Sequence, residues 1–375
     1  MRVLGPDDSV LLSWDRERGP GGSIDRLLDK ATTGQELCIL SPLVDDPEII
    51  GRLIAAAERG AQVKVVTGLG EQNRIKGSFE YQLLSGADLT DSSRHEANIQ
   101  RLARIPGIRV RSLRCLPHAK LVLLKGLEAI FSSVNLSPNA MARGQAESVE
   151  AGIRMAGGDL LDDLGAIFKQ LWEHAPIQFV LSGPDISIRE IGSRAPTLPR
   201  REAADLPVIA WSGPGFGAGI CETLVSWIRN ARKDIILAAL SFYDAEDLPE
   251  FYLALLAALD RGVRITVVVR PENFSPSRYP DPSTRKLVSR GLVLFGEPGL
   301  HAKGILVDDV FCGITSANFN PFSLNPGLPT SHFEMAIFGK AGSPLLARYA
   351  WFLQYLVQRA PVSWNERELP NTSDN

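Results

Sequence analysis

The feature that most constrains the fold of this 375-residue chain is an internal repeat. Short apolar runs typical of buried strands recur in both halves, each next to a segment with helical periodicity. The matched runs are 10–14 with 208–211, 37–42 with 235–242, and 63–67 with 263–270. In both halves the helix between the second and third runs closes on an Arg-Gly pair, a typical helix C-terminus. Strand, helix and strand with short connections predict an α/β fold, in which each half forms a largely parallel or mixed sheet flanked by helices.

The repeat also sets the predicted domain boundaries. Residues 1–182 form the first repeat, 208–375 form the second, and 183–207, rich in proline, arginine and acidic residues, are expected to be a linker. The spacing between equivalent positions falls from 202 residues at Arg59 and Arg261 to 183 at His118 and His301. The first copy is therefore about 19 residues longer, and we expect the excess, within 70–96, to be a loop near the substrate.

Composition limits the classes of function. A formal net charge of −3 argues against a uniformly basic nucleic-acid coat, although it permits a local basic groove. No apolar run reaches the roughly 18 residues of a membrane span, so no integral membrane segment is expected. The four cysteines form no Cys-x-x-Cys pair, which predicts reduced thiols and a cytoplasmic location. No clustered His or Cys spacing indicates a metal site, and no cofactor is expected.

The same polar residues recur at the matching place in each copy. A His-x-Lys leads an apolar run, a Ser-x-Asn closes the next run, and a Glu opens a third. The matched residues are His118, Lys120, Ser133, Asn135 and Glu150 in the first copy and His301, Lys303, Ser316, Asn318 and Glu334 in the second. His and Lys two positions apart on a strand project from one face, so these groups are expected to share one mouth at the sheet end.

These residue types suit the chemistry of a phosphate ester. The lysines supply positive charge, and the asparagine and serine side chains can donate hydrogen bonds to non-bridging oxygens. Two histidines offer a nucleophile and a general acid, and a carboxylate behind each would fix its tautomer. A single His-x-Lys would carry little weight, whereas twin copies with the same downstream residues are a specific signal.

The motifs resemble those of the phospholipase D superfamily, His-x-Lys-x4-Asp followed by Gly-Ser-x-Asn, over essentially the whole chain. The resemblance implies two repeats packed as a pseudo-dimer around one shared active site, and a metal-independent phosphodiesterase that works through a covalent phosphohistidine. It implies these roles: His118 and His301 as nucleophile and acid, Lys120, Lys303, Asn135 and Asn318 as phosphate-holding groups, and Glu150 and Glu334 as residues that orient the histidines.

Two positions depart from the family pattern. Lys125 stands where the first motif would have its Asp, whereas the second motif keeps Asp308, which suggests that the second copy is the more ideal half. The first glycine of Gly-Ser-x-Asn is replaced by Ser132 and Thr315. In the family that Asp is mainly a supporting residue, so the resemblance still implies activity.

Two weaker signals lie beside the motifs. Residues 97–120 carry five arginines and no acidic residue, and Arg109 and Arg111 fall on one face of an expected strand. They form either a basic approach for a polyanion or an edge strand charged against aggregation. His332, two residues before Glu334, either enters the site or is a hydrogen-bonded neighbour.

Three functions fit these observations. The favoured hypothesis is a nuclease acting on DNA or RNA, supported by the arginine run, the Ser-x-Asn sequences and the expected absence of a membrane segment. The alternatives are a phospholipase D or phosphatidyl transferase, and a catalytically weak nucleic-acid-binding subunit. Chains of this kind fit defence or DNA-modification systems, so nucleic acid and proteins of such a complex are the expected partners.

Overall fold

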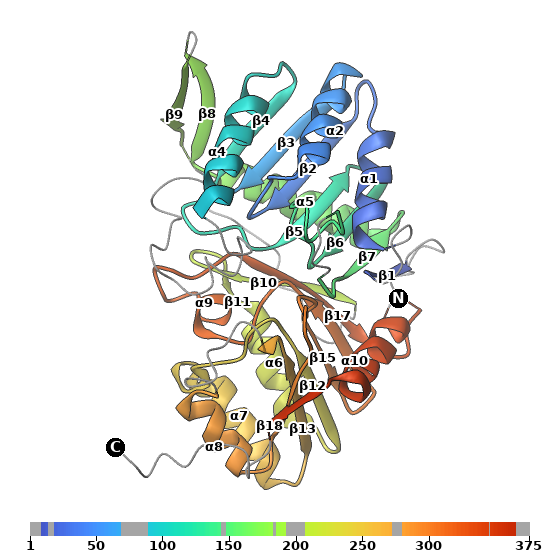
Figure 1. The fold of residues 1–375 in the computed structure, drawn as a ribbon, viewed down its shortest axis with the longest axis vertical. Helices are drawn as coiled ribbons and strands as arrows, with labels where there is room; N and C mark the ends of the chain where they lie inside the picture. The colour runs from blue at the N-terminus through green and yellow to red at the C-terminus, as the bar shows by residue number, and fades with distance from the viewer. Residues whose placement is uncertain are drawn as a thin grey trace.

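Each repeat forms its own large sheet, and the two repeats lie one above the other (Figure 1). The computed structural model describes residues 9–13, 19–68, 89–143, 148–182, 185–192, 207–271, 280–344 and 346–364. Within these residues each sheet has nine strands. The predicted α/β fold of two repeats, with a mixed sheet in each, is confirmed.

The two sheets share one strand order. The first runs β1 (Ser9–Leu12), β7 (Ala151–Met155), β6 (Glu128–Ser132), β5 (Lys120–Leu124), β2 (Glu36–Ser41), β3 (Gln62–Thr67), β4 (Ile108–Ser112), β8 (Ile177–Ser182) and β9 (Asp185–Glu190). The second runs β11 (Gly217–Ala218), β10 (Val208–Gly213), β17 (Glu334–Lys340), β16 (Phe311–Thr315), β15 (Gly304–Val307), β12 (Asp234–Ala238), β13 (Arg264–Val269), β14 (Val293–Gly296) and β18 (Val362–Trp364). From β1 to β8 and from β10 to β18, equivalent strands occupy equivalent places. Among the described strands of these sheets, parallel pairing occurs only within β2-β3-β4 and within β12-β13-β14.

Helices cover both faces of each sheet, and proline and aspartate set several of their starts. The outer helices are α1 (Pro20–Lys30), α2 (Pro47–Glu58) and α4 (Leu89–Ala103) in the first repeat, and α6 (Gly219–Asn230), α7 (Pro249–Asp260) and α8 (Pro282–Ser289) in the second. The inner helices are α5 (Asp159–His174) and α10 (Ala347–Arg359); the short η1 (Ala245–Asp247) and α9 (Pro321–Leu324) lie in connections. Asp46 and Asp281 cap α2 and α8, because each side chain accepts two backbone N–H groups of the first turn.

Three apolar cores hold these layers, and one of them spans both repeats. Each outer core packs the outer helices of one repeat against one face of its sheet. The shared core joins the inner faces, with Leu121 from β5 and Leu306 from β15, to Phe168 of α5 and Phe352 of α10. Burial of this shared surface fixes the two sheets relative to each other, as expected for a pseudo-dimer.

Two details differ from the sequence-based expectations. The expected linker, 183–207, contains β9, which pairs with β8 and extends the first sheet; residues 183–184 and 193–206 lie outside the described residues. The extra residues of the first copy were expected to be a loop, but 89–96 form the first half of α4. Residues 69–88 lie outside the described residues. None of the described helices combines the length and apolar composition needed to cross a membrane.

Candidate active site

The active-site residues are brought together by two short backbone bridges between the repeats. Pro117, just before the first His, pairs with Phe333, just before the second Glu. Leu300, just before the second His, pairs in the same way with Val149, just before the first Glu. The N–H of His118 donates to the carbonyl of Phe333 at 2.9 Å, and that of His301 donates to Val149 at 3.0 Å. Each histidine is thereby placed beside the glutamate of the other repeat.

The side chains form two buried His–Glu pairs that cross between the repeats. His118 Nδ1 lies 2.6 Å from Glu334 Oε1, and His301 Nδ1 lies 2.8 Å from Glu150 Oε1. All four residues are buried. A carboxylate at Nδ1 holds the proton of a neutral imidazole there, so that Nε2 keeps its lone pair for chemistry.

The serines of the Ser-x-Asn sequences hold the glutamates. The hydroxyl of Ser133 donates to Glu150 Oε2, and the hydroxyl of Ser316 donates to Glu334 Oε2. Each serine oxygen also accepts the backbone N–H that follows its glutamate, at 3.0 Å. Sequence analysis assigned both serines to substrate binding; because their hydroxyl protons are directed at the carboxylates, we reassign them to positioning Glu150 and Glu334.

The lysines and asparagines lie next to these pairs. The ammonium of Lys120 donates to the carbonyl of His118 at 2.6 Å, and Lys303 makes the same contact with His301 at 2.8 Å. Asn318 Oδ1 accepts from the N–H of Ser241 at 3.3 Å. Asn135 Oδ1 is buried and has no hydrogen-bond partner among the described residues, so this oxygen can accept a hydrogen bond from a ligand.

Burial sets the charge of each half-site. It lowers the pKa of His301 to about 4, against the opposing effect of Glu150, and it lowers the pKa of His118 well below the ordinary value. Burial alone would raise the pKa of both glutamates, but His301 and Ser133 lower the pKa of Glu150, and His118 and His332 lower the pKa of Glu334. Near neutral pH each half-site thus has a neutral imidazole paired with an ionised carboxylate, beside a lysine side chain.

The two half-sites are close enough to act as one. After burial and Lys303, the ammonium of Lys120 in the other repeat also lowers the pKa of His301. Such an effect on a buried group requires the two to be near neighbours. The expectation of a single shared site is consistent with this coupling and with the crossed pairs.

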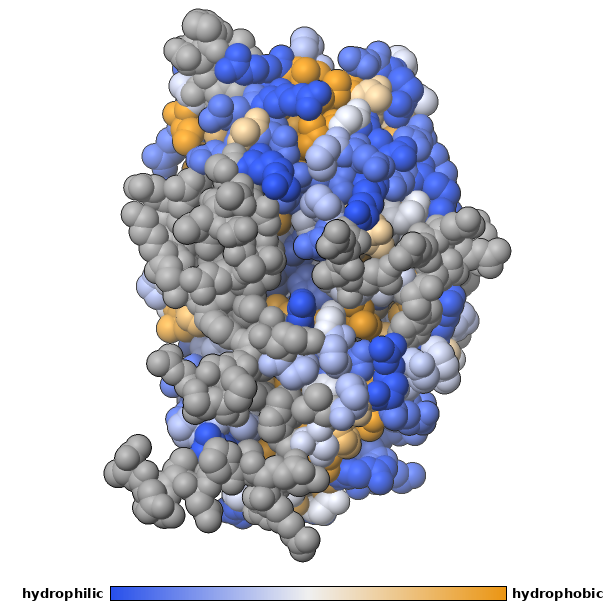
Figure 2. Space-filling model, in the orientation of Figure 1, coloured by the Kyte–Doolittle hydropathy of each residue, from blue (hydrophilic) through white to orange (hydrophobic). Residues whose placement is uncertain are grey.

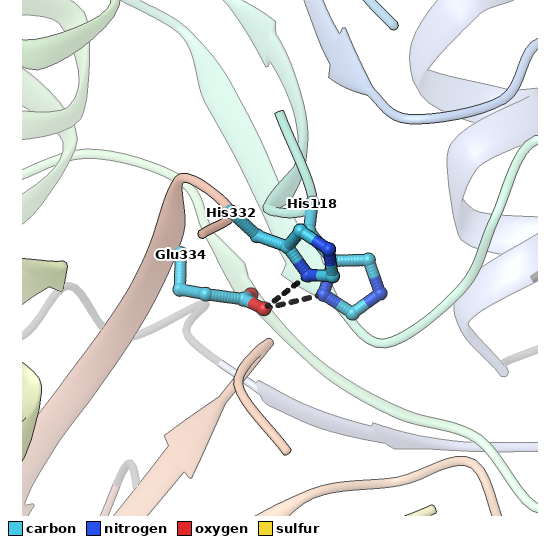
Figure 3. A group of neighbouring side chains, drawn as sticks. All are labelled: His118, His332 and Glu334. Atoms are coloured by element: carbon cyan, nitrogen blue, oxygen red, sulfur yellow. Dashed lines mark hydrogen bonds and ion pairs between the residues drawn. The ribbon is translucent and has the colours of Figure 1, made fainter. Parts of the chain in front are cut away.

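His332 enters the first half-site. Its Nδ1 lies 3.7 Å from Glu334 Oε1, and its ring centroid lies 5.3 Å from that of His118. Both rings point toward the Glu334 carboxylate (Figure 3). Ligand atoms of His118, His332 and Glu334 all lie within 4.8 Å of one another. Sequence analysis expected no metal-binding cluster, because spacing along the chain could not show that residues 118 and 332 are neighbours.

The arginine pair of the first repeat lies away from this centre. The guanidinium of Arg111 donates to the carbonyl of Trp172 at 2.7 Å and lies 4.4 Å from the centroid of that indole ring. Strand β4, which carries Arg109 and Arg111, is the third strand from β5, so roughly 14 Å separates them. Arg109 is exposed. The structure therefore gives Arg111 a packing role and does not bring either arginine to Lys120.

The aspartate of the second motif is also remote from the histidines. Asp308 follows β15, whereas His301 precedes that strand, so the two lie at opposite ends of it. Its carboxylate accepts the backbone N–H groups of Arg232, Lys233 and Asp234, at 2.7–2.9 Å. In the first repeat Lys125 instead forms an ion pair with Glu36 at 3.6 Å. Asp308 thus anchors the start of β12, and its presence does not make the second half-site chemically more complete.

Comparison with known families decides the identity of the fold. The family described as "Cardiolipin synthase, PLD-like domain" matches residues 24–172 and 224–350, one segment in each repeat. The chain belongs to the phospholipase D superfamily. Comparison with curated protein sequences gives no match. Superfamily members are phosphodiester-acting enzymes.

Two of the matching solved structures share this fold, and a third gives only a partial match. Phosphatidylserine synthase from Haemophilus influenzae Rd KW20 has a TM-score of 0.67 at 12% identity, over 97% of this chain and 89% of its own. Polyphosphate kinase from Porphyromonas gingivalis has a TM-score of 0.59 at 16% identity, over 97% of this chain and 49% of its own. The phospholipase D family member Nuc from Salmonella typhimurium matches 42% of this chain and 98% of its own, with 20% identity and a TM-score of 0.33.

The depressed pKa of His301 predicts a dependence of stability on pH. Between a folded-state pKa of about 4 and an unfolded value of about 6.5, the unfolded chain binds a proton that the folded chain does not. The free energy of unfolding should therefore rise with pH from about 4 to about 6.5 and contribute no further slope above that range. Urea unfolding at a series of pH values measures the slope. His301→Gln, which cannot titrate there, should show a shallower one, and equal slopes would contradict the prediction.

Asp308→Ala should lower stability and leave chemistry intact. It removes three hydrogen bonds to a carboxylate, so we expect a loss of about 1–3 kcal/mol in the free energy of unfolding by urea. Asp309→Ala is the matched control, because Asp309 has the same left-handed backbone but accepts only an exposed bond from Gln354. A loss of phosphodiesterase rate per folded molecule in Asp308→Ala alone would show instead that Asp308 acts in catalysis.

Proposed function

We propose that this protein is a metal-independent phosphodiesterase that cleaves DNA or RNA through a covalent phosphohistidine. The observation that carries the proposal is the pair of crossed, buried contacts that join His118 to Glu334 and His301 to Glu150. A histidine whose Nδ1 is held by a carboxylate presents Nε2 as either a nucleophile or a proton donor. Two such histidines in one centre are what a double-displacement reaction at phosphorus needs.

The residues divide the steps between them. Nε2 of one histidine attacks phosphorus and forms the P–N bond, while the other histidine, protonated, gives its proton to the departing ester oxygen. Water then attacks the phosphohistidine and loses a proton to the second histidine, which releases the phosphate ester and restores the first. Lys120 and Lys303 balance the charge of the phosphate, and the Nδ2 of Asn135 would donate to a non-bridging oxygen.

Binding of an anionic substrate also favours protonation of one histidine, with the proton taken from solvent. Burial keeps both imidazoles neutral in the free protein. A phosphodiester anion bound between them favours the protonated form of the histidine that lies near the leaving oxygen, and the glutamate behind that histidine stabilises it. The replacement of the first motif's Asp by Lys125 does not remove these groups, because Lys125 lies at the end of β5 that is far from His118.

Exposed arginines support a nucleic-acid substrate. Arg101 and Arg104, near the end of α4, and Arg109 on β4 are all exposed on the first repeat. The top of the visible face, where the helices of this repeat lie, shows hydrophilic side chains around an apolar patch (Figure 2). A row of guanidinium groups of this kind binds the phosphate backbone without regard to sequence. The arginines would hold nucleic acid outside the catalytic centre.

A lipid phosphodiester is the second candidate. It is favoured by the matching family, which is described as a cardiolipin synthase domain, and by the fold shared with phosphatidylserine synthase. The catalytic steps would be the same, with a lipid alcohol or water as the final acceptor. The two candidates differ in what the surface outside the histidines must bind, and direct assay separates them.

The test of function compares two substrates in the presence of excess EDTA. We expect nicking of supercoiled plasmid to persist in chelator, because histidines rather than a metal-bound water supply the nucleophile. Hydrolysis or transfer on phosphatidylcholine and phosphatidylglycerol vesicles is measured alongside. Lipid turnover without nicking would favour the second candidate. Loss of all activity in EDTA with rescue by Mg²⁺ would contradict the phosphohistidine mechanism.

The two histidines should behave as one catalytic unit. His118→Ala and His301→Ala should each lower the rate by about a thousandfold or more, and the double variant should be little worse than either. Acid-quenched turnover of a labelled substrate, followed by peptide mapping, should locate an acid-labile adduct on one of them. A near-normal rate in either single variant would mean that the half-sites act independently.

A further inference from the structure

A third imidazole distinguishes the two otherwise matching half-sites. His332 lies beside the His118–Glu334 pair, with its Nδ1 3.7 Å from Glu334 Oε1. The two rings flank one carboxylate (Figure 3), and all three side chains are at least 99% buried. The ligand atoms of the three lie within 4.8 Å of one another.

The pseudo-symmetry of the fold shows that this imidazole is not part of the common design. The two backbone bridges make Phe333 equivalent to Val149, so position 332 corresponds to position 148. Residue 148 is a serine. The His301–Glu150 pair therefore keeps its geometry without an imidazole at that place, and the chemistry shared by the two halves does not need His332.

We propose that His118, His332 and Glu334 bind a zinc-class divalent ion, and that this ion inhibits the catalytic centre. Two imidazole nitrogens and one carboxylate oxygen are the protein ligands of open tetrahedral zinc sites. Bond lengths of about 2.0–2.2 Å put neighbouring ligand atoms roughly 3.3 Å apart. The distances from Glu334 Oε1 to the Nδ1 atoms of His118 and His332, 2.6 and 3.7 Å, bracket that value.

The ligand set also determines which ions bind. Imidazole nitrogen favours Zn²⁺, Co²⁺ and Ni²⁺, whereas Mg²⁺ and Ca²⁺ take oxygen ligands and keep much of their water. The carboxylate of Glu334, already held by Ser316, supplies the negative charge that a buried cation requires. Magnesium is therefore expected to bind weakly, and it serves as the control ion.

Inhibition follows from the proton on His118. The ion at Nδ1 of His118 takes the place of the hydrogen that bridges to Glu334. The displaced proton is carried by Nε2 instead, so the imidazole stays neutral and changes only its tautomer. Nε2 then has no lone pair with which to attack phosphorus or accept a proton. This consequence rests on the proposed function, whereas ion binding itself does not.

The binding test uses the metal alone. Co²⁺ added to the wild-type protein should give one equivalent of tight binding, measured by calorimetry and by visible absorption typical of a four- or five-coordinate ion. His332→Ser, which copies the other half-site, should weaken binding by at least about tenfold. His332→Asn is a second variant in case the serine leaves a destabilising cavity, and circular dichroism checks the fold of each. Equal Co²⁺ affinity in the wild type and a folded variant would overturn the site.

A gain-of-site variant and an activity assay complete the design. Ser148→His should add a second equivalent of Co²⁺ beside His301 and Glu150. Zn²⁺ should inhibit the wild-type phosphodiesterase, and His332→Ser should need at least about tenfold more Zn²⁺ for half-inhibition, each relative to its own zinc-free rate. Activity with no Co²⁺ binding would refute this proposal alone. Co²⁺ binding in a protein that cleaves neither substrate would support the ion site and refute the proposed function.

Discussion

The arrangement of the site depends on two backbone bridges that cross between the repeats. Each bridge pairs the residue before a histidine with the residue before the glutamate of the other repeat. Backbone hydrogen bonds fix the position and direction of the chain beside each His and Glu more tightly than side-chain contacts alone. Each imidazole is therefore held next to its carboxylate. Because both bridges are needed for two complete pairs, neither repeat has a finished half-site by itself. The shared core of α5, α10 and the inner sheet faces holds the repeats in that register.

Near-symmetry of the backbone coexists with differences in the side chains that surround it. Tyr349 of α10 donates to the carbonyl of Lys303 at 2.8 Å and fills the space where a Cβ on Gly304 would stand. The equivalent position in the first repeat is Leu121, which packs in the shared core. His332 and Ser148 differ in the same way at the glutamates. The two halves of the centre are thus alike in backbone and unlike in their neighbours, which allows one histidine to be regulated separately from the other.

The features of the fold that the sequence predicted are those defined by local pattern. Strand and helix positions follow from periodicity and from breaks at glycine and proline, and these signals act over a few residues. The repeat then singled out the matching His, Lys, Asn and Glu residues of each copy. Ser133 and Ser316 were assigned to the substrate because the direction of a hydroxyl cannot be inferred from spacing. The packing of Arg111 against Trp172 could not be predicted, because the two residues lie 61 positions apart along the chain.

The sequence alone determined the α/β class, the two copies and the set of phosphate-type residues in each, because these depend on composition and short-range order. Only the tertiary structure decided that His118 meets Glu334 rather than Glu150, that Asp308 anchors a strand far from the histidines, and that His332 joins the first half-site. His118 and Glu334 are 216 residues apart in sequence. Contacts over such separations are set by how the two sheets pack across the shared core, which no local pattern records.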